Sequence, residues 1–308
     1  MKVNKAIVAS ETLPLPQTNH DKQEKQRPQT HWHSLLIWSF RLILLFTTLF
    51  FVALTLQTQS AVQAQSFSCA TVTEIPVSEC EGLVYLYNNM GGPNWFQQDG
   101  WLITDTPCSW FGINCLAAHV FEIKLEGNNL IEPIPTNWGM PNLRYLHLDN
   151  NKITKIPSTF TGLSNLRVIW LDDNQITNIP SDFTGLNSIQ TIFLRRNQIT
   201  ELPANFTGLE TLQILSLEGN HITELPATFT GLQNLTELIL SDNQITKFPS
   251  HFIGLDNLVY LSLAFNQITE FPANFTGLNN LTELELRFNK IVQFPANFTG
   301  LDNLQRLH

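Results

Sequence analysis

A single unit of 23 residues repeats along the chain from Val120 to His308, and this period constrains the fold more than any other feature. The unit reads L-x-x-L-x-L-x-x-N-x-I and continues with a hydrophobic residue, a proline and the pattern F-x-G-L. A unit this short cannot bury its apolar residues alone, so copies must stack around one continuous core. The period therefore predicts an elongated solenoid of about eight turns.

Each position in the unit has a predictable structural role. In L-x-L the apolar residues alternate with period 2, which predicts a short strand that turns one side to the core and the other to solvent. An asparagine follows every strand, where its amide can satisfy backbone groups that the turn leaves unpaired. A phenylalanine column, Phe160 to Phe298, predicts an aromatic spine in the interior. The asparagine column is Asn128, Asn151, Asn174, Asn197, Asn220, Asn243, Asn266 and Asn289.

The repeat closely resembles the leucine-rich repeat, and the resemblance covers residues 120–308. It implies an α/β solenoid in the form of a horseshoe. Parallel strands would lie on the concave side, and short helical or extended turns would lie on the convex side. The sequence stops in the first strand of a ninth repeat without a polar capping segment. We expect that the natural product continues, that it is truncated, or that a second copy or partner covers this end.

All four cysteines lie between the apolar run Leu35–Leu56 and the first repeat, in the cap region of residues 65–119. An even number of cysteines in an exported cap predicts two disulfides. Three pairings are open, of which the sequence-local one, Cys69 with Cys80 and Cys108 with Cys115, is favoured. A zinc site is the competing interpretation, but the spacing contains no C-x-x-C pair.

Part of this region carries a second resemblance. Gly92–Trp95 reads G-P-N-W, and Cys108–Cys115 reads C-S-W-F-G-I-N-C. These residues resemble the N-terminal cap of extracellular leucine-rich repeats in plant receptor-type proteins and in bacterial secreted proteins. Ser78 followed by Glu81 also fits a capping box that would begin a short helix.

Residues 1–64 have the pattern of an export signal. A polar segment with basic residues precedes the apolar run Leu35–Leu56. Its uninterrupted part, Leu42–Leu56, is shorter than the roughly 20 residues that span a bilayer, which favours a signal peptide cleaved after Ala64. An uncleaved transmembrane signal-anchor is the alternative. In both cases the protein is exported, either secreted or anchored at the outer face of the membrane, and only this segment would contact the membrane.

Several function classes lack their residues in this sequence. No nucleotide-binding, metalloprotease, hydrolase or kinase motif is present, which predicts a protein without enzymatic activity, cofactor or catalytic metal. The formal net charge of −9 argues against binding to a phosphate backbone, so nucleic acid is not the expected partner.

The outward positions of the predicted strands depart from the repeat pattern in one place. Three large rings follow one another in the central outward column, and Tyr145 and Val168 border them on one side. Because neighbouring strands lie about 4.8 Å apart, these rings should form one contiguous row on the concave face. Clustered exposed aromatic residues are the usual centres of an interface. The column is Lys124, His147, Trp170, Phe193, Ser216, Ile239, Ser262 and Glu285.

Charged residues border the rings on the other side. These are Asp149, Asp172, Arg195 and Arg196, and together with the rings, Tyr145 and Val168 they form the predicted ligand-binding surface. In the competing interpretation the rings only shield each other and Asp172 pairs with Arg195 across the sheet. A cation held by Asp149, Asp172 and Asp173 is a further alternative.

Two hypotheses of different class follow. The first is an extracellular or surface recognition module that binds a protein or peptide, or else a glycan, through the concave face. The second is a structural or adhesive envelope protein that acts by self-association at its uncapped C-terminal end.

Overall fold

The structure, a computed structural model, describes residues 67–297 and 299–308. The predicted export segment within residues 1–64 lies outside these residues, as does Phe298. In the described part, no helix combines the length and the apolar character needed to cross a membrane.

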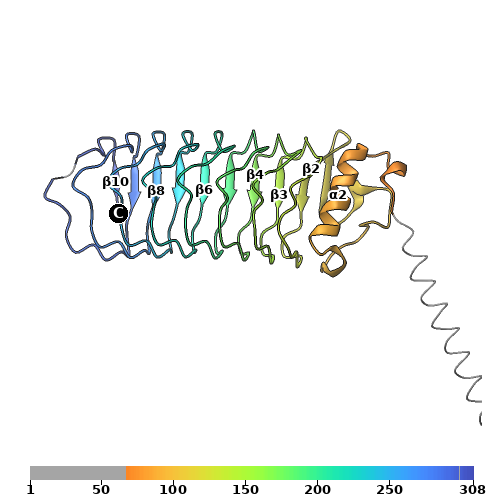
Figure 1. The fold of residues 1–308 in the computed structure, drawn as a ribbon, viewed down its shortest axis with the longest axis horizontal. Coiled ribbons are helices and arrows are strands. Elements are labelled where there is room, and N and C mark those ends of the chain that lie inside the picture. The colour runs from red at the N-terminus through yellow and green to blue at the C-terminus, as the bar shows by residue number, and fades with distance from the viewer. Residues whose placement is uncertain (1–66, 298) are drawn as a thin grey trace, which may run out of the picture. The chain divides into compact units, whose positions relative to one another are not determined.

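The cap contains the helices and the first strand of the described residues (Figure 1). A 13-residue α-helix, α2 (Val77–Asn89), is surrounded by three short 3₁₀ segments. These are η1 (Cys69–Thr71), η2 (Gly92–Asn94) and η3 (Pro107–Ser109). Strand β1 (Ile113–Leu116) pairs antiparallel with the first strand of the solenoid.

Ten strands form one sheet in the order in which they occur in the sequence. From β2 onward every strand pairs in parallel with the next, as stacking of identical units requires. The strands are β2 (His119–Lys124), β3 (Tyr145–His147), β4 (Val168–Trp170), β5 (Thr191–Phe193), β6 (Ile214–Ser216), β7 (Glu237–Ile239), β8 (Tyr260–Ser262), β9 (Glu283–Glu285) and β10 (Arg306–Leu307).

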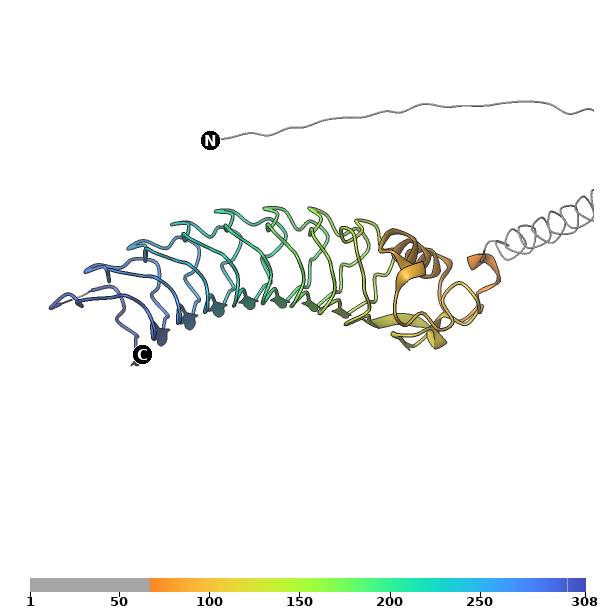
Figure 2. The same cartoon turned by 90° about the horizontal axis from the view of Figure 1, so that it is seen from below.

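The parallel strands line the inner side of a gently curved stack (Figure 2). The outer side carries extended segments joined by isolated parallel bridges, such as Thr159 with Thr184 and Asn205 with Thr230. The resemblance allowed helical or extended turns here, and the structure has the extended form. The predicted solenoid of leucine-rich repeat type is therefore confirmed.

The core is continuous from the cap toward the last turns because the repeats bury the same positions, except at the C-terminal end, where Ile291 is half-buried and Phe294 is exposed. The phenylalanines of the spine from Phe160 to Phe275 are buried, and rings of neighbouring repeats stack in two places: Phe160 on Phe183 at 6.2 Å and Phe229 on Phe252 at 6.3 Å between ring centroids. At the cap end Trp95, Trp101 and Trp110 are buried and pack against one another, so they close the end of the core.

The asparagine column forms a buried hydrogen-bonded ladder. The Nδ2 of Asn197 donates to the carbonyl of Leu171 in the preceding repeat at 2.9 Å, and to Leu194 in its own repeat at 3.2 Å. Its Oδ1 accepts from the backbone N–H of Ile176 at 3.0 Å. From Asn151 onward each asparagine thus pairs backbone groups of two adjacent turns, which is the structural role expected from the sequence, whereas Asn128 bonds the backbone of Gln97 in the cap.

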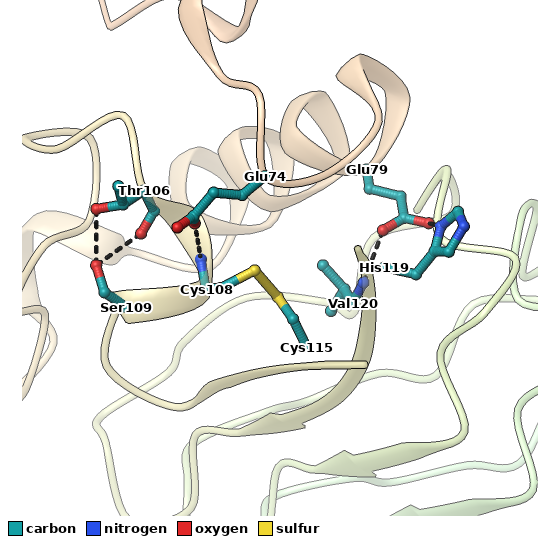
Figure 3. Close-up of a disulfide and its surroundings, with 8 residues drawn as sticks. All are labelled: Glu74, Glu79, Thr106, Cys108, Ser109, Cys115, His119 and Val120. Carbon is teal, nitrogen blue, oxygen red and sulfur yellow. Dashed lines mark hydrogen bonds and ion pairs between the residues drawn. A yellow bond between two sulfur atoms is a disulfide. The ribbon is translucent and has the colours of Figure 1, made fainter. Parts of the chain in front are cut away.

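Two disulfides crosslink the cap. Cys69–Cys80 joins η1 to α2, and Cys108–Cys115 joins η3 to β1 (Figure 3). These are the sequence-local pairs, and no cysteine of the described residues is free. The two expected disulfides are therefore present.

A buried carboxylate connects the cap to the solenoid (Figure 3). Glu79, on α2, accepts a hydrogen bond from the backbone N–H of Val120 at 2.7 Å and lies 2.7 Å from Nδ1 of His119. Both partners are in β2, the first strand of the parallel sheet. The helix and the sheet are therefore bonded directly to each other.

The predicted capping box is wrong. Helix α2 begins before Ser78, with Pro76 at the N-cap and no hydrogen bond from a side chain at this end. The carbonyl of Pro76 accepts the first hydrogen bonds, from the N–H groups of Glu79 and Cys80. Proline already has a φ near −65°, so it can start a helix without the help of a polar side chain.

Candidate functional site on the concave face

Three rings form a contiguous row across β3, β4 and β5, hereafter the ring row: His147, Trp170 and Phe193. The imidazole and the indole stack at 3.9 Å between centroids and 8° between planes. The indole and the phenyl ring stack less closely, at 5.9 Å and 23°. The middle residue of each strand is buried, so the rings project from the sheet.

The ring row is half-buried because each ring shields its neighbour. The next residue in the same column is Ser216, which is buried, so the row ends at Phe193. Each ring retains some accessible surface while the stacking restricts its rotation. Rigid aromatic rings lose little conformational entropy when they bind a partner.

On one side of the ring row lie Tyr145 and Val168, which are paired in register and half-buried. The Tyr145 ring lies 6.4 Å from Trp170 and 5.4 Å from Phe121, so it continues the aromatic surface toward the cap. The predicted apolar border is therefore brought together with the rings.

On the other side of the ring row the charges are already paired. Asp172 is buried and accepts hydrogen bonds from the backbone N–H of Arg195 at 2.7 Å and from its Nε at 2.8 Å. Arg196 binds the Asp173 carboxylate with its guanidinium, with Nε 2.6 Å from Oδ1. This hydrogen bond from Arg196 holds the pKa of Asp173 below its ordinary value, and the bond to Asp172 raises the pKa of Arg195.

This pairing is the one expected from the competing interpretation for Asp172 and Arg195. The rings also shield one another in part, as that interpretation expects, but each keeps some accessible surface. Asp149 lies at the same border, where its Oδ2 accepts from Asn150 at 2.8 Å. The charged residues therefore hold one another in place beside the ring row.

At the cap end of the ring row, Glu122 connects three side chains of the concave face. Its carboxylate lies 3.1 Å from Nε2 of His147 and 3.0 Å from Nζ of Lys124, and it accepts from Asn114. Burial opposes ionisation of Glu122, but these hydrogen bonds outweigh it and hold its pKa below the ordinary value. Glu122 thus fixes the orientation of the imidazole at the start of the row.

The alternative of a bound cation finds no support in the geometry. Within residues 67–297 and 299–308, no group of three or more histidine, cysteine or acidic side chains is placed to hold a metal ion. Two of the three carboxylates considered, Asp172 and Asp173, are occupied by arginines.

Sequence reasoning missed a second group of stacked aromatic residues, which lies just after strands β8 and β9. Phe265 and Phe288 stack at 4.3 Å, remain 54% and 68% exposed, and have φ angles of 54° and 58°. A bulky residue rarely adopts this left-handed conformation. Both residues directly precede a ladder asparagine, so their spacing of one repeat could have revealed them.

Comparison with known families identifies the repeats. The sequence profile of the family described as "Leucine rich repeat" matches four overlapping stretches, residues 118–176, 141–199, 165–222 and 210–268. The chain is a leucine-rich repeat protein. Its repeats are preceded by a disulfide-bonded cap. A search of curated proteins found no match.

Three solved structures are similar to this chain over part of its length. The TLR13–ssRNA13 complex is 26% identical over 58% of this chain and 31% of that chain, with a TM-score of 0.43. The PEPR1–AtPEP1 structure is 23% identical over 71% and 35%, with a TM-score of 0.49. InlP of Listeria monocytogenes is 28% identical over 58% and 49%, with a TM-score of 0.48. This leucine-rich repeat protein thus spans less than half of each.

Proposed function

We propose that this leucine-rich repeat protein is a non-enzymatic recognition module that binds a protein or peptide through its concave face. The observation that carries the proposal is the ring row. Three large rings stand in one outward column, whereas the same column holds buried serines at Ser216 and Ser262 farther along the stack. Aromatic clusters of this kind supply most of the binding energy in protein interfaces.

The charged border supports the same location. Asp172 and Arg195 satisfy each other, so a partner would not have to leave a buried charge unpaired when it covers the rings. The rings are the apolar part of this surface, and the release of water from them lowers the free energy of the complex.

We further propose that the protein acts outside the cytoplasm, secreted or held at the membrane surface by the segment before residue 65. The two disulfides support this location because such bonds persist in oxidising compartments.

A capture experiment tests the proposal. The full-length protein and its Trp170→Ser/Phe193→Ser variant are presented to extracellular and cell-surface extracts, and the retained proteins are identified. The variant should bind one defined partner at least about 100-fold more weakly, because each truncated ring removes a large share of the interface energy. A circular dichroism spectrum and melting temperature close to wild type confirm that the variant is folded.

The matched control is Phe96→Ser, which truncates an aromatic side chain of the cap that is 73% exposed. It should retain the partner at wild-type level. Equal retention by the ring-row variant, or capture of the protein's own copies only, would contradict the proposal. Capture of its own copies would favour the second hypothesis, self-association.

A further inference from the structure

Two arginines of the described residues lack the acidic partner that every other described arginine has. Arg195, Arg196, Arg287 and Arg306 each pair with a carboxylate. Arg144 and Arg167 pair with no carboxylate of residues 67–297 and 299–308; the one contact of the Arg144 guanidinium is with the ring of Phe121, at 5.5 Å.

These two arginines are neighbours in adjacent repeats. Arg144 directly precedes β3 and Arg167 directly precedes β4, and the N–H of Arg167 donates to the carbonyl of Arg144 at 2.9 Å. Both side chains are exposed. Like charges at equivalent positions of adjacent repeats repel each other, so this arrangement favours an anion between or above them.

The two side chains also line an open depression of about 290 Å³. The remaining wall consists of amide and hydroxyl side chains, among them Asn165, Asn187 and Gln190, and none of the described residues that line it is acidic. Through Gln190 the depression adjoins a larger one of about 700 Å³ on the same flank, which is lined by neutral residues only. The two depressions together form a groove lined mainly by hydrogen-bonding side chains, with the two arginines at one end.

We propose that Arg144 and Arg167 form an anion subsite that takes a carboxylate of the protein or peptide ligand. The proposal deepens the proposed function and rests on it for the class of ligand. Tyr145 and Val168, the residues that border the ring row, directly follow the two arginines in sequence. A ligand that covers Trp170 can thus place a carboxylate on the arginines within the length of a few residues.

The guanidinium group suits this ligand chemistry. Its planar fork of N–H donors matches a carboxylate and can bind it with two hydrogen bonds. Two arginines match one or two carboxylates, whereas a polyanion would be repelled by the net negative charge of the protein. The carboxylate can come from an acidic side chain or from the C-terminus of a polypeptide, which share the same chemistry.

Arginine Nε–H resonances of the full-length protein, labelled with ¹⁵N in arginine only, test the subsite directly. The probes are acetyl-Leu-Gly-Gly-Glu-amide, acetyl-Leu-Gly-Gly-Gly with a free C-terminus, and the neutral acetyl-Leu-Gly-Gly-Gln-amide. Arg144→Gln and Arg167→Gln assign the two resonances. We expect saturable shifts of both signals with at least one carboxylate probe and none with the neutral probe, and the responding probe identifies the source.

Arg167→Gln should weaken binding of the responding probe at least about tenfold, since hydrogen bonds to charged groups are among the strongest. The control Arg306→Gln, which removes an arginine already paired with Glu283 at the far end of the sheet, should leave the affinity unchanged. No saturable shift, an equal shift with the neutral probe, or unchanged affinity in Arg167→Gln would overturn the subsite.

The Trp170→Ser/Phe193→Ser variant separates this inference from the proposed function. It should retain the carboxylate-dependent shifts, because the arginines do not depend on the rings for their position. If that variant still captured every partner while the shifts persisted, the ring row would fail as the recognition site and the anion subsite would stand. Loss of capture without any carboxylate-dependent shift in wild type would leave only the ring row.

Discussion

Gly231→Ala should destabilise the solenoid strongly. Gly231 has a φ of 91°, and a Cβ built on it would lie 1.6 Å from the carbonyl oxygen of Phe206 in the preceding repeat. The left-handed backbone costs a non-glycine residue about 1–2 kcal/mol. Overpacking against a backbone atom adds about 1–3 kcal/mol. Urea unfolding followed by circular dichroism should show the corresponding drop in the midpoint.

Gly127→Ala is the matched control. Gly127 also has a positive φ, 61°, but a Cβ there would meet no atom within 4 Å. It should lose only the backbone contribution. The difference between the two variants therefore measures how tightly adjacent repeats are stacked, and equal midpoints would contradict the close approach of Gly231 to Phe206.

Asn197→Ala should have the second large effect on stability. The substitution leaves the buried N–H of Ile176 without an acceptor and removes the shorter of the two hydrogen bonds that the carbonyl of Leu171 accepts, so that only the bond from Asn174 remains there. Each buried polar group left unpaired costs about 1–3 kcal/mol. We expect a loss of several kcal/mol in urea unfolding and faster hydrogen exchange at Ile176.

The control for this variant is Asn178→Ala, in the preceding repeat. Asn178 is exposed, and its side chain accepts one hydrogen bond, from Thr177 at 3.3 Å. Its removal should change the midpoint little. If Asn197→Ala behaved like Asn178→Ala, the asparagine column would not hold the turns together.

Much of the fold could be predicted because every copy of the repeat has the same residue types at the same positions. The alternation in L-x-L, the asparagine after each strand and the buried phenylalanine each occur at the position that their side chains require. Once the turns stack, the register of neighbouring strands follows from the constant length of the unit. This is why His147, Trp170 and Phe193 could be placed in one row from the sequence alone.

The remaining features depend on contacts between particular side chains, which the repeat period does not specify. Whether Asp172 is free or paired is decided by the conformation that Arg195 adopts in the next repeat. That Arg167 has no acidic partner among the described residues could not be foreseen either, because it requires the positions of all neighbouring acidic groups. The predicted cap at Ser78 failed because Pro76 offered another way to start the helix.

The candidate site has an aromatic centre and two charged borders. One border consists of ion pairs, and the other consists of two arginines without an acidic partner in the described part of the chain. On one border Asp172 and Arg195 neutralise each other, and on the other Arg144 and Arg167 remain available to a ligand. A partner that is apolar at its centre and acidic at one edge fits this arrangement.

Site-specific photocrosslinking tests the concave face most directly as the recognition surface. A photoreactive phenylalanine derivative replaces Thr191, which lies on β5 beside the ring row, or Thr200, which is exposed after the strand has left the sheet. The account predicts one defined crosslinked protein from position 191, absent when Trp170→Ser/Phe193→Ser is introduced, and none from position 200. Crosslinks from position 200 alone, or from both positions equally, would contradict it.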